Sequence, residues 1–155
     1  MKSGVKIFLA VALIAGGAGV SAHVAMAHGG AKGIVKERMD AMGDLAKTMK
    51  QVGGMLRGKV PYDPTEIAQA AERLKQHGGS EMTKLFPDGS LEAPSEAKPE
   101  IWANWQKFEA FANDLSEKAG ALKAASMDQS AVPAAFGAVG KTCKACHEEF
   151  RLKKD

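Results

Sequence analysis

The segment Cys143-Lys144-Ala145-Cys146-His147, near the C-terminus, constrains this chain more than any other feature. Two thiols three positions apart, followed at once by an imidazole, form the c-type haem attachment pattern. On one helical turn the two thiols can add to the two vinyl groups of a porphyrin, and the adjacent imidazole can reach the iron. We therefore expect one covalently bound haem c per chain, with Cys143 and Cys146 as thioethers and His147 as the proximal iron ligand.

Two other interpretations of the cysteines are weaker. A C-x-x-C dithiol would make the chain a thiol oxidoreductase, but that motif is expected beside a βαβ pattern, and no segment alternates with a period of two. Half of a zinc site would need a second pair of ligands, which the sequence does not offer. The sequence also lacks paired carboxylates, a nucleophile–base set or a phosphate loop, so we expect no enzyme.

The N-terminus has the three regions of a secretory signal peptide. Lys2 and Lys6 precede an apolar stretch over residues 7–15, and Ala25-Met26-Ala27 fits the A-x-A cleavage rule. Glycines from position 16 onward interrupt the apolar stretch before it reaches the roughly 20 residues that a membrane span needs. We expect residues 1–27 to be a cleaved signal peptide, residues 28–155 to form a periplasmic haem domain, and no stable membrane insertion.

Charge and length narrow the class of protein further. The chain has 155 residues and a net charge of +3, which falls to about +1 without the two lysines of the signal peptide. A charge this small argues against a nucleic-acid partner. The length suits one domain, and two cysteines are too few for a disulfide scaffold.

Four segments carry the helical spacing of apolar residues. The first covers residues 32–57, and the second begins after its N-cap, Asp63, and ends at residues 78–79. The third covers residues 99–125, and the fourth begins at about residues 128–131 and ends at residue 153. A crossover loop with three prolines spans residues 87–99. Both cysteines lie on the apolar seam of the last helix. We therefore predict an all-α, antiparallel four-helix bundle that encloses one covalently bound haem.

The chain resembles the class II c-type cytochromes, the cytochrome c′ superfamily. The resemblance rests mainly on AAFGAVGKTCKACHEEFR, with weaker support from VKERMDAM, GKVPYD, LFPDGS and PEIW. It implies a four-helix bundle with one haem near one end, and often a homodimer.

The residue opposite His147 decides the function. Met42 lies on the apolar seam of the first helix, which faces the core of the bundle. The first-helix arginine is Arg38, and the resemblance implies that the residue four positions after it, Met42, faces the distal iron. A thioether there favours Fe(II) and closes the site, as in the low-spin His/Met branch that the chain resembles. We therefore expect Met42 as the distal ligand. Met49 and Met39 are alternatives, and ordinary core packing by Met42 is another.

Arg38 is the unusual cation on the apolar seam of the first helix. A charged hydrogen bond to a haem propionate would explain its position, and snorkelling to solvent is the alternative.

These residues lead us to expect a periplasmic monohaem electron carrier that cycles between Fe(II) and Fe(III) with redox partner proteins. The alternative is a five-coordinate, high-spin cytochrome c′ that binds nitric oxide or carbon monoxide, in which Met42 packs near the iron without bonding to it.

Overall fold

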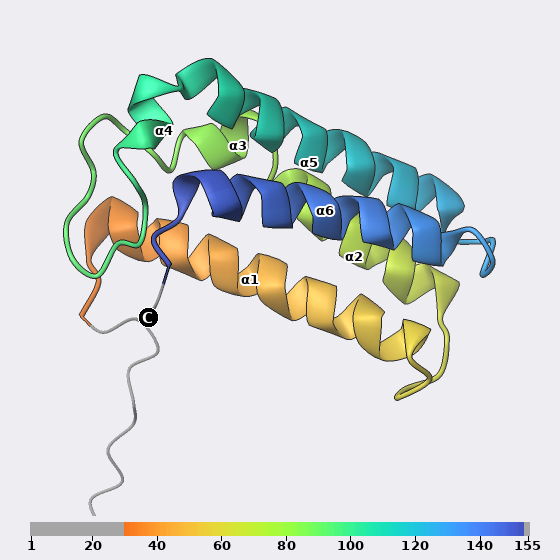
Figure 1. Ribbon diagram of the computed structural model, residues 1–155. Coiled ribbons are helices and arrows are strands. Elements are labelled where there is room, and N and C mark those ends of the chain that lie inside the picture. The colour runs from red at the N-terminus through yellow and green to blue at the C-terminus, as the bar shows by residue number, and fades with distance from the viewer. Residues whose placement is uncertain (1–29, 154–155) are drawn as a thin grey trace, which may run out of the picture.

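The computed structural model describes residues 30–153, so the predicted signal peptide and its cleavage after Ala27 lie outside the described residues. Within that range the chain is an all-α bundle of four long helices (Figure 1). These are α1 (Gly33–Leu56), α2 (Pro64–Gln76), α5 (Trp105–Ala125) and α6 (Val132–Phe150). Successive long helices run in opposite directions. The predicted fold class is therefore confirmed.

The beginning of α2 follows from its capping residues. The Asp63 carboxylate accepts hydrogen bonds from the backbone amides of Thr65 at 2.8 Å and Glu66 at 3.1 Å. Pro64 occupies the first helical position, where a missing N–H group costs nothing. This helix begins where the sequence predicts.

The third predicted helix is interrupted. The structure has a short α4 (Glu100–Ala103) and then α5, because Asn104 leaves the helical region at φ −126° and ψ 43°. The Asn104 side-chain amide donates to the carbonyl oxygen of Glu100 at 3.2 Å, a local bond typical of residues that break helices. A further short helix, α3 (Ser80–Thr83), precedes the crossover loop and was not predicted.

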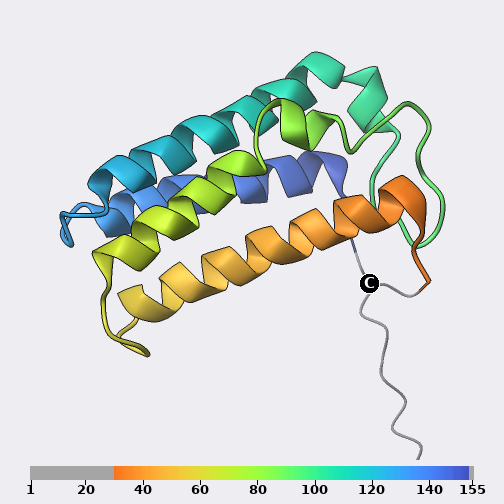
Figure 2. The same ribbon diagram turned by 180° about the vertical axis from the view of Figure 1, so that it is seen from behind.

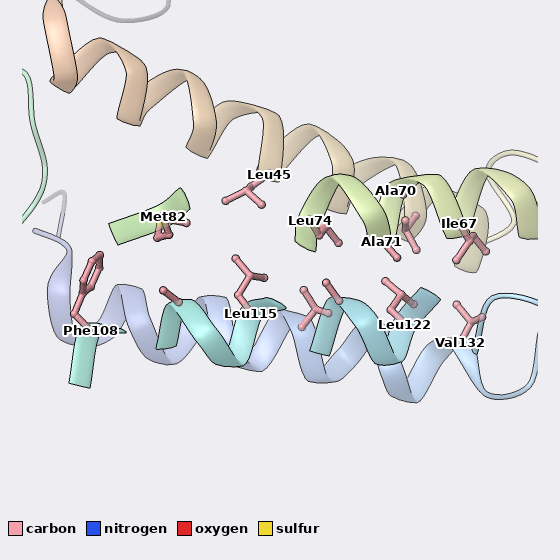
Figure 3. Packing of buried hydrophobic residues seen from close by; sticks show 14 of the residues in the cluster. Leu45, Ile67, Ala70, Ala71, Leu74, Met82, Phe108, Leu115, Leu122 and Val132 are labelled. Atoms are coloured by element: carbon pink, nitrogen blue, oxygen red, sulfur yellow. The ribbon is translucent and has the colours of Figure 1, made fainter. Parts of the chain in front are cut away.

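The core lies mainly between α2 and α5, and between α5 and α6. Figure 3 shows the buried side chains of α2, among them Ile67 and Leu74, facing Leu115 and Leu122 of α5. The end of α2 meets α5 through backbone, since the Gly79 amide donates to the carbonyl oxygen of Ala112 at 2.7 Å. This packing fixes the position of α5 against α2, and α6 in turn packs against α5.

The crossover segment, residues 87–99, passes between the beginning of α1 and the end of α6 (Figures 1 and 2). At one side it pairs with the residues after α6 through an antiparallel bridge between Ala97 and Arg151. This pairing explains why α6 ends at Phe150 and not at the predicted residue 153. None of the helices in the described part of the chain is long and apolar enough to cross a membrane.

Candidate haem site

A cavity of about 470 Å³ lies between α1 and α6. The two helices approach each other near Met49, which lines the cavity: a Cβ placed on Gly140 would lie 3.9 Å from the Cε atom of Met49. The rest of the wall comes from α3, α4 and α5, from Phe86, from the crossover segment and from Arg151 after α6. All five residues that the sequence singled out for the site line this cavity: Arg38, Met42, Cys143, Cys146 and His147.

The two cysteines lie half-buried on the face of α6 that borders the cavity, and they do not form a disulfide with each other. Burial raises the pKa of Cys143, and it raises the pKa of Cys146 to about 11. Both thiols are therefore protonated at neutral pH. They stand one helical turn apart beside an apolar space, as two thioether links to one porphyrin require.

His147 follows directly on the same helix and also borders the cavity, with part of its surface exposed. Burial lowers the pKa of its imidazole; the Arg151 guanidinium adds to this effect and Glu96 opposes it. The lowered pKa favours the neutral imidazole, which is the form that binds a metal ion. The thiols, the neutral imidazole and the apolar cavity fit a covalently bound haem.

The opposite wall belongs to α1 and is mainly apolar. Met42 is half-buried there, and Met39 and Met49 also border the cavity. Gly43, Leu45 and Ala46 also belong to this wall, as does Arg38. Coordination of the iron by Met42 stays a prediction, as do the roles of the other four site residues.

Arg38 lies inside the protein, with only 5% of its surface exposed, so it does not snorkel to solvent. Its Nε donates to the carbonyl oxygen of Leu85 at 3.0 Å. Its Nη1 donates to the carbonyl oxygen of Ser90 and to Ser95 Oγ at 3.0 and 2.9 Å, and its Nη2 donates to Ser90 Oγ at 2.5 Å. The guanidinium also stacks on Phe86, 4.1 Å from the ring centroid. Four of its five N–H groups thus have partners among the described residues, and a bond from the fifth, on Nη2, to a propionate stays a prediction.

Sequence reasoning missed the part of the wall that the crossover segment and the end of α6 supply. These residues are Pro94, Ser95, Glu96, Ala97 and Arg151. Residues 94–97 sit in a loop without periodicity, so no pattern indicated that they face the cavity. Arg151 follows the attachment motif by four positions and could have been placed one turn beyond His147.

The fold and site together define a haem-binding four-helix bundle. The chain matches the family described as Cytochrome C' over residues 33–151. It is 34% identical to cytochrome c-556 of Agrobacterium tumefaciens, over 79% of this chain and 99% of the relative. It is 32% identical to cytochrome c′ of Alcaligenes xylosoxydans, over 77% of this chain and 94% of the relative.

A solved structure of a cytochrome c prime is also similar to this chain. A mutant of cytochrome c prime from Alcaligenes xylosoxidans, in complex with nitric oxide, is 32% identical and has a TM-score of 0.69; the match covers 78% of this chain and 94% of the other. The chain belongs to the cytochrome c′ family. Members of this family carry one covalently bound haem c per chain, so the predicted cofactor is confirmed.

The predicted function is wrong. We expected an electron carrier, but the family is cytochrome c′ and one solved relative is a nitric oxide complex, which agrees with the alternative. The predicted membership of the low-spin His/Met branch is likewise unsupported. The reason for the error is physical: methionine fills apolar seams as readily as it binds iron, so Met42 on the seam does not by itself indicate a bond.

Proposed function

We propose that the chain is a five-coordinate cytochrome c′ that binds nitric oxide or carbon monoxide. The observation that carries the proposal is the distal wall, where α1 presents Met42, Leu45 and Ala46 to the cavity. An apolar wall favours small uncharged ligands over water or anions. The relative with bound nitric oxide, 32% identical, supports this class of ligand.

In this proposal each residue has a separate task. When bound, the haem supplies an iron whose sixth position is open to a diatomic ligand. Cys143 and Cys146 fix the porphyrin to α6, and neutral His147 holds the iron from the proximal side. Met42 packs over the distal side without bonding to the iron. Arg38 donates its remaining N–H to a propionate and neutralises part of its charge.

We also infer that residues 1–27 direct the chain to the periplasm and are removed, and that residues 28–155 work there. Homodimerisation and contact with redox partner proteins stay predictions from the sequence.

The test is a carbon monoxide titration of the purified, reduced holoprotein followed by its visible spectrum. The proposal predicts a high-spin ferrous spectrum that changes to that of a six-coordinate carbon monoxide adduct as the gas is added. A low-spin ferrous spectrum that the gas leaves unchanged would contradict it. The charge-conservative variant Lys36→Arg, on the exposed side of α1, serves as a control and should titrate like the wild type.

A further inference from the structure

An ion pair joins the crossover segment to the residue that follows α6. The Arg151 Nε donates to Oε2 of the Glu96 carboxylate at 2.7 Å, and Nη2 of the same guanidinium lies 2.5 Å from that oxygen. Both side chains border the haem cavity, as does His147. The pair therefore lies on the cavity wall beside the residue proposed to hold the iron.

Backbone contacts keep this pair in place. The Leu152 amide donates to the carbonyl oxygen of Glu96 at 2.8 Å, and the Lys98 amide donates to that of Phe150 at 3.0 Å. The Arg151 amide in turn donates to the carbonyl oxygen of His147 at 3.2 Å. These backbone hydrogen bonds lie on both sides of the ion pair and fix the backbone of both charged residues. The carboxylate and the guanidinium therefore meet in a defined geometry, four residues beyond His147 in the chain.

The two charges act on His147 in opposite directions. The Arg151 guanidinium and the Glu96 carboxylate carry opposite charges, and both border the cavity that His147 also borders. A cation beside a ligating imidazole draws electron density away from the iron, and a paired carboxylate offsets that cation. Part of the wall is exposed, so the pair contributes little to stability, and its effect on the imidazole is the more important one.

We propose that Glu96 is a positioning residue for the proximal side of the haem: it holds Arg151 and offsets the charge of that guanidinium beside His147. This inference rests on the proposed function, in which His147 is the iron ligand. Without Glu96, the Arg151 guanidinium is uncompensated and free to reorient. The imidazole then donates less electron density, which weakens the iron–histidine bond and favours Fe(II).

The experiment compares the reduced holoproteins of Glu96→Gln and Glu92→Gln. Glu92 lies on the same segment and is exposed, outside the cavity lining, so its replacement removes the same charge without touching the pair. Resonance Raman spectroscopy measures the iron–histidine stretching frequency, and redox titration measures the midpoint. Glu96→Gln should lower the frequency and raise the midpoint, increasing the Fe(II)/Fe(III) ratio at a fixed potential roughly threefold. Glu92→Gln should keep the wild-type frequency.

Two further variants separate positioning from other effects. Glu96→Asp retains the charge and should keep the frequency close to the wild-type value. In an Arg151→Gln background, Glu96→Gln should lower the frequency much less than in the wild-type background, since only the direct charge of Glu96 is lost and there is no guanidinium left to hold. The proposal is overturned if Glu96→Gln matches Glu92→Gln, if Glu96→Asp shifts the frequency as far as Glu96→Gln, or if the effect of Glu96→Gln is just as large without Arg151.

The same spectra distinguish this proposal from the proposed function. If the wild-type ferrous protein has no iron–histidine band and does not bind carbon monoxide, the proposed function itself fails. If the wild type shows the band and binds the gas, while Glu96→Gln behaves like Glu92→Gln, only the role of Glu96 is refuted.

Discussion

Arg38 in α1 donates from Nη1 to the carbonyl oxygen of Ser90, 52 residues further along the chain, at 3.0 Å. Together with its bond to Ser95, this contact ties the crossover segment to α1, and the bond to Leu85 holds the residues just before the segment. The other side of the segment is held by the residues after α6. The segment therefore spans from the distal helix to the proximal one, across one end of the haem cavity.

Replacing Arg38 should loosen this segment. The variant Arg38→Gln leaves buried acceptors of the segment without donors, at a cost of about 3 kcal/mol in the free energy of unfolding. Urea unfolding of the holoprotein, followed by circular dichroism, measures this loss. Lys36→Gln is the control, because Lys36 pairs with Asp40 on the exposed side of the same helix and should cost under about 0.5 kcal/mol. Equal losses in the two variants would show that Arg38 does not hold the segment.

Gly78 should not tolerate a side chain. A Cβ at this position would lie 2.4 Å from Ser116 Oγ and 2.9 Å from the Ser116 backbone nitrogen. Gly78→Ala should therefore push α2 away from α5 and destabilise the protein by roughly 1–3 kcal/mol. Thermal unfolding provides the measurement. The control is Gly120→Ala, which meets no atom within 4 Å and replaces a helical glycine, so it should be neutral or slightly stabilising. An unchanged melting temperature in Gly78→Ala would refute the close contact.

The double variant Cys143→Ala, Cys146→Ala should lose covalent haem. Both thiols face the cavity and no other cysteine exists in the chain, so no thioether can form. Acid–acetone extraction of the purified protein, followed by the haem spectrum of each phase, measures attachment. Haem that remains with the double-variant protein after extraction would contradict the assigned links. Replacement of Lys144, the exposed residue between the cysteines, by Ala should leave attachment intact.

The helices could be predicted because their signals are local. Seam spacing and the Asp63 cap depend on residues within a few positions of each other, and the corresponding helices begin within a residue or two of the predicted points. The break at Asn104 was missed because the apolar seam continues across it, from Ile101 to Phe108. The last helix ends early because of a pairing with Ala97, which is far away in the sequence.

The site could be predicted only in part. The spacing of the attachment motif led to Cys143, Cys146 and His147, all of which border one cavity with Met42. The place of Glu96 on the cavity wall could not be predicted from the sequence, because its contact with Arg151 depends on the path of an aperiodic loop. The sequence also could not decide whether Met42 bonds to the iron. A bond and a packing contact place the same residue on the same seam.

The proposed function requires Met42 to lie over the iron without bonding to it. The rate of carbon monoxide association with the reduced holoprotein, measured by stopped flow in the wild type and in Met42→Ala, tests it directly. If Met42 only packs near the iron, the wild type is high-spin and binds the gas in one step. The variant then remains high-spin and binds the gas faster, because a smaller side chain opens the distal wall. The proposed function would be contradicted by a low-spin wild type that has a sulfur-to-iron charge-transfer band when oxidised, binds carbon monoxide slowly, and becomes high-spin only when Met42 is removed.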